Sequence, residues 1–176
     1  ADDGTGSGAA LTRVEILNVA PEVDPGGPYF GFEGERVDFT ATASDPGADM
    51  LEYRWDFDND GTFDTQRSMM PSASFVFPQN IMGTSRLEVF DGTDATIVLV
   101  SHMIGNRPPR IDSSPGRSVD ENTPYTYQVT FQDPGLLDAH TYTLTDAPAG
   151  MSISDMGLLT WTPTSASNPI GLYEFC

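Results

Sequence analysis

The chain has 176 residues, and its 26 acidic and eight basic residues give a formal net charge of −18 at pH 7. Nucleic acid and anionic membrane surfaces would both repel such a chain, whereas divalent cations would be attracted to it. A single cysteine excludes an intrachain disulfide, and no apolar run is long enough to insert into a membrane.

The sequence repeats itself with a period of 88 residues. A repeat of about 90 residues is typical of one β-sandwich domain, and arrays of such domains span distance. The period therefore predicts an extended structural or binding protein. The recurring motifs are Asp3-Gly4-Thr5 with Asp91-Gly92-Thr93, Asn18 with Asn106, Pro21 with Pro109, Glu33 with Glu121, and Asp45-Pro46-Gly47 with Asp133-Pro134-Gly135.

The two ends of the sequence continue this period. Residues 171–176 followed by residues 1–5 would read like the internal stretch 83–93. We therefore expect one period of a longer tandem array, or a subunit that donates residues 1–20 to its neighbour. The expected parts are closing strands of a preceding or neighbouring domain at 1–20, a complete sandwich at 21–107 and a sandwich lacking its last strands at 108–176.

Short alternating runs of apolar and polar residues predict half-buried strands, and helix signals are nearly absent. Gly, Pro, Asp, Ser and Thr interrupt the chain between these runs. This spacing is typical of antiparallel sandwiches and not of a parallel α/β sheet. The runs are 36–41, 51–55, 73–77, 125–129 and 141–144.

A Gly-rich stretch at 26–34 lies outside this strand pattern and carries Tyr29, Phe30 and Phe32. Exposed aromatic rings can stack on sugars, and they can equally fill a domain interface. The interface is favoured, because the stretch follows a Pro-rich link at 19–21. Surface glycans remain a second possible partner.

An acidic segment at 56–64 is the most specific local signal. Its carboxylates stand at the first, third, fifth and ninth positions, with Gly61 at the sixth, which follows the logic of a calcium loop. Arg67 occupies the twelfth position, where an EF-hand has a bidentate Glu. The alternative is a tight turn whose aspartates accept backbone hydrogen bonds. The candidate ligands are Asp56, Asp58, Asp60 and Asp64.

Further motifs cover nearly the whole of residues 21–107. They are Gly26-Gly27-Pro28-Tyr29, Glu33-Gly34, Val37-Asp38-Phe39, Ser44-Asp45-Pro46-Gly47, the run from Tyr53 to Gly61, and Val89-Phe90-Asp91-Gly92. With these motifs the segment resembles a PKD (polycystic kidney disease) repeat of bacterial surface proteins. The resemblance implies an immunoglobulin-like sandwich with Trp55 in its core and an extracellular spacer or adhesion role. Arg86 departs from the family pattern and is expected at an exposed edge or a contact.

A second set of motifs covers residues 108–176. They are Asn106-Arg107-Pro108-Pro109, Asp120-Glu121-Asn122, Tyr125-Thr126-Tyr127, Asp133-Pro134-Gly135, Tyr142-Thr143-Leu144, the run from Ala147 to Met151, and Leu159-Thr160-Trp161-Thr162-Pro163. This segment is similar to cadherin-like bacterial immunoglobulin domains. The similarity implies calcium ligands at Glu121, Asp133 and Asp138, and the period transfers them to Glu33, Asp45 and Asp49.

Two arginines stand where that family carries acidic linker residues, namely Arg107 and Arg110. The alternative to calcium is therefore that Glu121 and Asp133 pair with these arginines or cap turns. Trp161 lies in an alternating run and is expected in the core.

No motif of an enzyme stands out in the sequence. His102 and His140 are far apart, lack a metal-binding spacing and have no local Ser or Cys nucleophile motif, and His140 is interpreted as a surface residue. Paired carboxylates are too abundant to indicate a general acid and base.

The sequence therefore predicts an all-β protein of tandem immunoglobulin-like antiparallel sandwiches in a head-to-tail array. Its expected function is that of a non-enzymatic extracellular repeat, which forms a calcium-stabilised fibre, stalk or surface layer at the cell surface. Its expected partners are copies of itself. The alternatives are a carbohydrate- or partner-binding module of a secreted enzyme, and an inert spacer.

Overall fold

The computed structural model describes residues 13–166, 168 and 171. Strands, turns and irregular segments make up this part of the chain, and it contains no helix. The predicted closing strands at 1–20 lie partly outside it, and residues 13–20 within it form no strand. Cys176 also lies outside the described residues.

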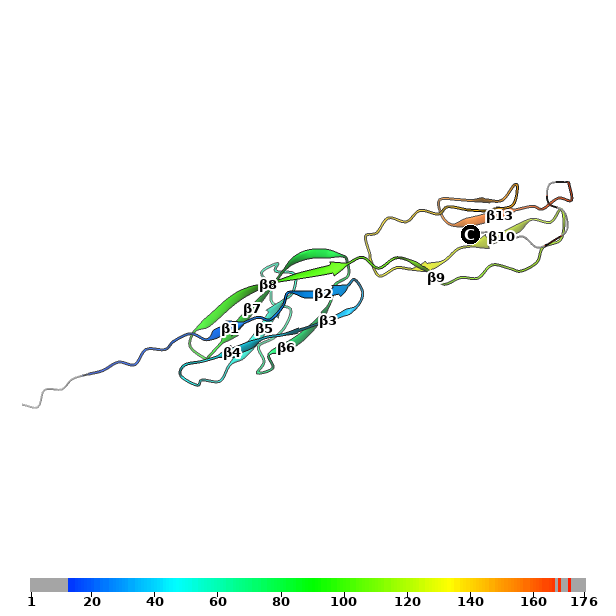
Figure 1. Ribbon diagram of the computed structural model, residues 1–176. Helices are drawn as coiled ribbons and strands as arrows, with labels where there is room; N and C mark the ends of the chain where they lie inside the picture. The colour runs from blue at the N-terminus through cyan, green and yellow to red at the C-terminus, as the bar shows by residue number, and fades with distance from the viewer. Residues whose placement is uncertain (1–12, 167, 169–170, 172–176) are drawn as a thin grey trace, which may run out of the picture. The chain divides into compact units, whose positions relative to one another are not determined.

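The described residues form thirteen strands, most of them short (Figure 1). They are β1 (Glu22–Asp24), β2 (Tyr29–Phe32), β3 (Arg36–Thr40), β4 (Thr42–Ser44), β5 (Glu52–Asp56), β6 (Ser72–Val76), β7 (Ile81–Phe90), β8 (Ala95–Gly105), β9 (Arg110–Ile111), β10 (Tyr125–Gln128), β11 (Phe131–Gln132), β12 (Ser152–Ile153) and β13 (Leu158–Trp161).

The chain divides into two compact units. Unit 1 comprises Ala1–Gly27, Phe39–Ala73 and Thr84–Val100, and unit 2 comprises Pro28–Asp38, Ser74–Gly83 and Ser101–Cys176. Strands β3, β6, β7 and β8 contribute residues to both units.

Aromatic side chains form the core of unit 1. Trp55 is 1% exposed, and its ring lies 5.4 Å from that of Phe39 and stacks on that of Phe57 at 6.1 Å. Leu87 and Val89 of β7 are fully buried opposite β5, because alternate residues of paired strands face the same side. The predicted core position of Trp55 is confirmed.

A four-stranded sheet has the order β2-β8-β7-β5 and contains both antiparallel and parallel neighbours. Strands β5 and β7 run antiparallel, whereas β2 runs parallel to β8 with Tyr29 opposite His102 and Gly31 opposite Ile104. The stretch 26–34 therefore contains a strand, and the prediction that Tyr29, Phe30 and Phe32 lie outside the strand pattern was wrong. The ladder with β8 supplies backbone partners that a Gly-rich sequence does not reveal.

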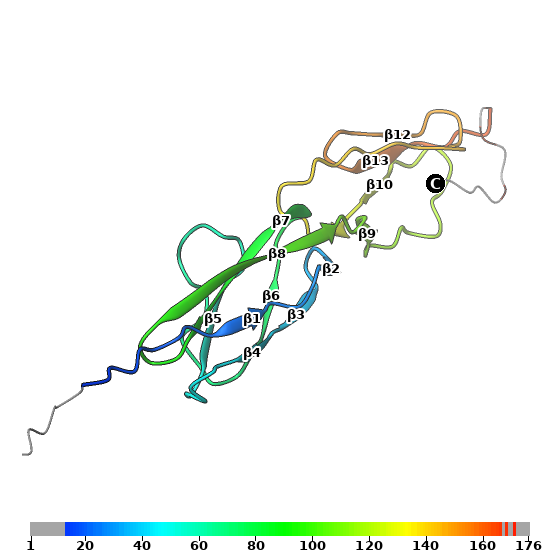
Figure 2. The same ribbon diagram turned by 60° about the vertical axis from the view of Figure 1, so that its left-hand side comes forward.

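Two small sheets lie in unit 2, one of β10, β13 and β12 and one of β9 and β11 (Figure 2). Leu159 and Trp161 are 1% and 9% exposed, so the predicted core position of Trp161 is confirmed. Residues 141–144 alternate between exposed and half-buried as predicted, but they form no strand. Alternation places side chains on two faces, whereas a strand also requires a backbone partner.

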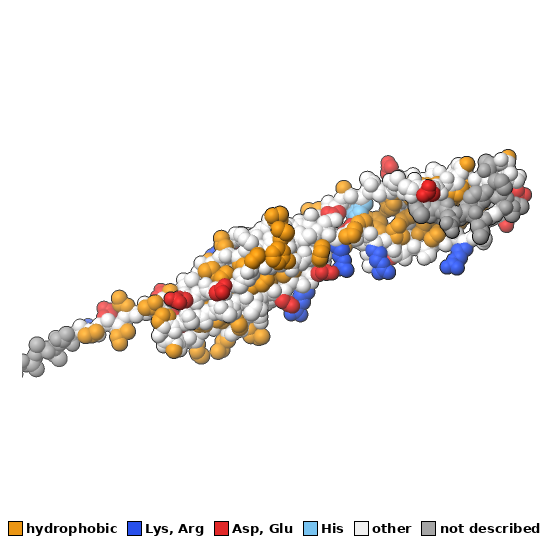
Figure 3. All heavy atoms as spheres, viewed as in Figure 1, with side chains coloured by type: hydrophobic (Ala, Val, Ile, Leu, Met, Phe, Trp, Pro, Cys, Tyr) orange, Lys and Arg blue, Asp and Glu red, His pale blue; other side chains and the backbone are white. Residues whose placement is uncertain are grey.

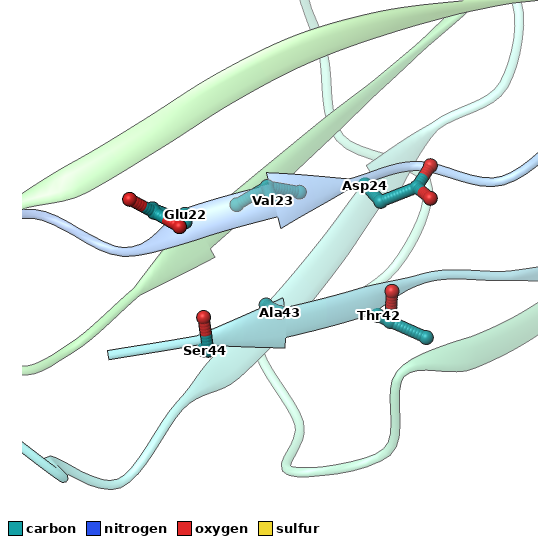
Figure 4. Close-up of a pocket in the computed structure, with 6 residues that line it drawn as sticks. All are labelled: Glu22, Val23, Asp24, Thr42, Ala43 and Ser44. Carbon is teal, nitrogen blue, oxygen red and sulfur yellow. The ribbon is translucent and has the colours of Figure 1, made fainter. Parts of the chain in front are cut away.

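The 88-residue period is visible in the strand register. In unit 1, β1 pairs antiparallel with β4, with Val23 opposite Ala43 (Figure 4). In unit 2, β9 pairs antiparallel with β11, with Ile111 opposite Phe131. Both members of the second pair lie 88 residues after those of the first. The pairing of β1 with β4 therefore recurs in the second half of the sequence in the same register.

The hollow beside β1 and β4 is a weak candidate for a binding site. It measures about 430 Å³ and is lined by the six residues of the two strands. The carboxylates of Glu22 and Asp24 point away from each other in it (Figure 4). It therefore lacks converging polar groups, which a small-molecule site requires.

A buried carboxylate on β7 anchors two arginines in unit 1. Glu88 is 5% exposed, and its carboxylate accepts hydrogen bonds from Arg54 at 2.7 and 2.8 Å and from Arg67 at 2.6 and 3.1 Å. The two guanidinium groups also cover the rings of Phe63 and Phe90 at 3.8 and 3.9 Å. Burial of Glu88 raises its pKa, but the hydrogen bonds and charges of the two arginines outweigh this and lower the pKa overall.

Replacing Glu88 should therefore destabilise the protein in a pH-dependent way. Because the pKa of Glu88 is lowered on folding, its contribution is fully present above the ordinary Glu pKa of about 4.3 and is lost as pH falls through the folded pKa. We expect Glu88→Gln to lower the free energy of unfolding by about 1–3 kcal/mol at pH 7. Urea denaturation at a series of pH values should show this difference shrinking in acid.

A matched control is Asp38→Asn, which breaks the exposed ion pair of Asp38 with Arg36. It should cost less than about 1 kcal/mol at pH 7. Equal effects of the two substitutions would contradict a stabilising role of the buried cluster.

Candidate metal sites

The acidic loop follows β5 in unit 1 and returns to it. The backbone N–H groups of Asp64 and Thr65 donate to the carbonyl of Trp55, which closes the loop at its base. Asn59 and Gly61 have positive φ angles of 56° and 96°, and the second is a conformation that glycine adopts without strain. The predicted role of Gly61 in the sharp turn is thus confirmed.

Three carboxylates converge in this loop. Oxygens of Asp56, Asp58 and Asp60 lie within 4.8 Å of one another, and Asp64 does not belong to this group. The buried Asp56 carboxylate accepts hydrogen bonds from the N–H groups of Asp60 and Gly61 at 3.2 and 3.1 Å. The aspartates therefore hold the turn, as the alternative considered above requires. A carboxylate has about four lone-pair sites, so these bonds leave capacity for a cation.

Burial and neighbouring groups shift the pKa of Asp64. Its carboxylate accepts a hydrogen bond of 2.7 Å from the N–H of Phe57, which lowers its pKa. Desolvation by burial raises that pKa more strongly, and the negative charges of Asp58, Asp56 and Asp60 add to the increase. The pKa of Asp64 is therefore raised, chiefly by burial and to a lesser extent by the neighbouring carboxylates.

A second group of carboxylates lies in unit 2 and joins residues distant in sequence. Oxygens of Glu33, Asp133 and Asp138 lie within 4.8 Å of one another. Glu33 is fully buried, and its two oxygens accept hydrogen bonds from the N–H groups of Arg107 at 2.8 Å and Asn80 at 2.7 Å. Burial of such a charge is costly unless it is paired or bonded, so these contacts are necessary.

The Asn106 side chain completes this group. One end of its amide lies 2.8 Å from Glu33 Oε1 and 2.7 Å from Asp138 Oδ2. With its nitrogen at this end, the amide donates a hydrogen bond to each carboxylate. With its oxygen there, the amide would face two acceptors and donate to neither carboxylate.

Asp133 is held at the edge of the group by two partners. His140 Nε2 lies 2.7 Å from Asp133 Oδ2, and the N–H of Gly135 donates to Oδ1 at 2.9 Å. These hydrogen bonds, that of His140 foremost, lower the pKa of Asp133. His140 is half-buried against the ring of Phe131 at 4.4 Å, and it also lines a surface hollow.

A hollow of about 510 Å³ borders Asp133 and His140. Its lining comes from two short stretches of unit 2, residues 131–136 and His140. Of the three carboxylates in the group, Asp133 lines this hollow.

Comparisons with known proteins identify the two segments. Residues 18–97 match the family model described as "PKD domain", and residues 108–175 match the model described as "Putative Ig domain". The chain carries a PKD domain followed by an immunoglobulin-like domain. Both are typically extracellular, adhesion-type modules without catalytic activity. No curated protein sequence matches the chain.

Solved structures share the fold of this PKD and immunoglobulin-like pair. The insect immune protein hemolin is similar with a TM-score of 0.50 and 12% identity, covering 94% of this chain and 43% of hemolin. The alignment thus spans less than half of hemolin, and the likeness shows tandem immunoglobulin-like all-β sandwiches. The predicted fold class is confirmed.

Two further solved structures align with TM-scores of 0.37. Human protocadherin-24 EC1-2 is 13% identical over 84% of this chain and 79% of its own. The three N-terminal domains of the bacteriophage RB49 Hoc protein are 15% identical over 82% of this chain and 58% of theirs. Within the described residues, no helix is long and apolar enough to cross a membrane.

The predicted ligands of the PKD and immunoglobulin-like segments lie together in other combinations than the sequence suggested. Glu33 lies with Asp133 and Asp138, and not with Asp45 and Asp49. Asp45 instead accepts the N–H of Gly47 at 2.7 Å in an exposed turn that also contains Asp49. Glu121 is exposed and takes no part in either group of the described residues.

The two linker arginines do not form the predicted alternative pairs in the described residues. Arg107 forms an exposed ion pair of 2.6 Å with Glu35, while its backbone bonds to Glu33. His140 is the partner of Asp133. The other histidine, His102, is 4% exposed and packs on Phe77 at 4.6 Å, and burial lowers its pKa.

Asn106 is the residue that the sequence did not indicate as a ligand. A signal existed, because Asn106 is the repeat of Asn18. In unit 1 the Asn18 amide donates to Asp91 and Asp94 at 2.9 Å each, so each Asn bridges two carboxylates. The bond from Asn18 is the main reason why the pKa of Asp91 is lowered.

Removing the carboxylate that supports the acidic loop should destabilise unit 1 even without metal. Asp56→Ala leaves the N–H of Gly61 without an acceptor and leaves the N–H of Asp60 with Asp58 Oδ1 alone, so we expect it to lower the free energy of unfolding by about 1–3 kcal/mol in chelator. Asp58→Ala, on the exposed side of the same loop, should cost less than about 1 kcal/mol. Urea denaturation measures both, and an equal cost would contradict the role of Asp56.

Proposed function

We propose that the chain is a structural repeat of an elongated extracellular fibre, stalk or surface layer, and that bound calcium stabilises it. The observation that carries the proposal is the group formed by Glu33, Asp133, Asp138 and Asn106 in unit 2. The PKD and immunoglobulin-like domains support the extracellular setting, and the absence of an enzyme motif supports a non-catalytic role.

The chemistry of this group suits calcium. Calcium takes six to eight oxygen ligands and tolerates irregular geometry. Three carboxylates and the amide oxygen of Asn106 offer most of them, and water would complete the set. Binding would turn the Asn106 amide, so that its oxygen and not its nitrogen faces Glu33 and Asp138. The acidic loop of Asp56, Asp58 and Asp60 would form a second calcium site with fewer protein ligands.

Calcium at this group would stiffen unit 2. The ligands come from β2's end, the segment after β8 and the segment after β11, which are distant in sequence. An ion that bridges them binds the folded chain and not the unfolded one, so it raises the free energy of unfolding. It also reduces the repulsion within a chain of net charge −18.

The 88-residue period supports a role in an array of copies. The pairing of β1 with β4 recurs 88 residues later, in the same register, as the pairing of β9 with β11. A mechanical element built in this way lengthens by repetition. The expected partner is therefore another copy of the chain.

Calcium should stabilise the protein, and the effect should depend on unit 2. Saturating calcium at about 100 times Kd corresponds to about 2.7 kcal/mol, seen as a rise in Tm. Asp138→Asn and Glu33→Gln should each abolish most of this rise, because each removes a charged ligand. Calorimetric titration with calcium and thermal melts with and without chelator provide the measurements.

Glu121→Gln is the control for these variants, because Glu121 is exposed and outside the group. It should respond to calcium as the wild type does. If chelation changes neither the Tm nor assembly, the calcium proposal is wrong and the inert spacer is supported.

Carbohydrate binding is a second candidate function, which the aromatic residues of β2 favour. Phe30 and Phe32 are 65% and 52% exposed and lie two apart on one strand, so they face the same side. We expect Phe30→Ala with Phe32→Ala to abolish any retention on chitin or other polysaccharide. Tyr29→Ala, on the other face, is the control, and retention that survives the double substitution would exclude this surface.

A further inference from the structure

An extended apolar segment precedes β1 in unit 1. Val14 and Ile16 are 80% and 93% exposed, and they alternate with the charged residues Arg13 and Glu15. In two views the segment runs clear of the strands of unit 1, and hydrophobic side chains stand out on its surface (Figures 1, 2 and 3). This alternation is that of a half-buried strand, yet residues 13–17 pair with no described strand.

The repeat shows what such a segment does elsewhere in the chain. Val14 and Ile16 correspond, 88 residues later, to His102 and Ile104 in β8. Those two residues are 4% and 3% exposed, and they lie on the buried side of β8 opposite β2. Residues 13–17 thus have the sequence position and the apolar face of a strand that is buried in the other repeat.

The natural partner of this strand is the counterpart of β2. Strand β2 corresponds to residues 117–120 in unit 2. These residues form no strand among the described residues, although β9 and β11 keep the register of β1 and β4. Their backbone N–H and C=O groups therefore lack the ladder partners that β2 has in β8.

We infer that residues 13–17 of one copy bind residues 117–120 of a second copy as a parallel strand. The β2–β8 register, shifted by 88 residues, places Ile16 opposite Val119 and Glu15 opposite Ser118. Val14 and Ile16 then face the core, and Glu15 faces solvent. This inference rests on the proposed array of copies and names the residues that join them.

Side-chain chemistry supports this pairing. A Cβ atom at Gly31 would lie 3.8 Å from Ile104 Cδ1, and it would also lie only 2.6 Å from Val37 Cγ2. A side chain at the corresponding position therefore reaches its strand neighbour once the residue equivalent to Val37, which is Tyr125, leaves room for it. That position is Val119 in the second repeat, and its counterpart neighbour is Ile16. Two apolar groups would therefore meet where the first repeat has only one.

Sedimentation velocity on the 176-residue chain tests the inference by complementation. The wild type should associate with increasing concentration, because each copy has a donor segment and an acceptor. Ile16→Asp disables the donor, Val119→Asp disables the acceptor, and each variant alone should remain monomeric. Mixed in equal amounts they should form dimers and nothing larger, because only one intact donor and one intact acceptor meet. Glu15→Gln should associate as the wild type does.

Cysteine pairing tests the register. In a Cys176→Ser background, Glu15→Cys and Ser118→Cys chains should form a mixed disulfide, since neighbouring strands lie about 4.8 Å apart, within disulfide reach. Arg117→Cys, whose side chain projects to the opposite face, should not crosslink with Glu15→Cys. If Val119→Asp unfolds, Ser118→Pro serves as the second acceptor variant.

Three outcomes would overturn the inference. These are a wild type that is monomeric at every concentration, association of Ile16→Asp equal to the wild type, and a mixture that stays monomeric. The calcium-dependent rise in Tm separates this result from the proposed metal site. Ile16→Asp should keep that rise while losing association, whereas a failed metal site would remove the rise and leave association unchanged.

Discussion

An extended backbone needs a partner strand for its N–H and C=O groups, and this requirement organises the whole chain. In the first repeat, β8 lies between β2 and β7, so both of its edges are paired. In the second repeat, two small sheets keep their pairing, while residues 117–120 and 141–144 have no strand partner among the described residues. The need for backbone partners therefore explains the sheet of the first repeat. It also indicates where an additional strand would fit in the second repeat.

In the two candidate metal sites, the clustered carboxylates accept hydrogen bonds from different kinds of donor. In the acidic loop, the backbone N–H groups of the turn satisfy the aspartates locally. In unit 2, the fully buried Glu33 accepts hydrogen bonds from residues far away in sequence, and the Asn106 amide bridges Glu33 and Asp138. The first site is therefore held by neighbouring backbone groups, whereas the fold assembles the second.

The sequence predicted one of the two carboxylate groups better than the other. The spacing of Asp56, Asp58 and Asp60 indicated a local group, because a short loop brings such residues together whatever the rest of the chain does. Glu33, Asp133 and Asp138 were each candidates, but their combination was not predicted. Glu33 replaces Glu121 in that group because the fold brings an equivalent residue from the other repeat to Asp133.

The sequence by itself determined the 88-residue period, the buried face of most strands and the core positions of Trp55 and Trp161, because side chains project alternately and apolar ones seek the interior. The tertiary structure alone decided that Gly-rich β2 pairs with β8 and that 141–144 form no strand. Strand pairing is made by backbone groups, which are nearly the same in every residue. A side-chain pattern therefore shows which way a strand faces, and the fold decides what lies beside it.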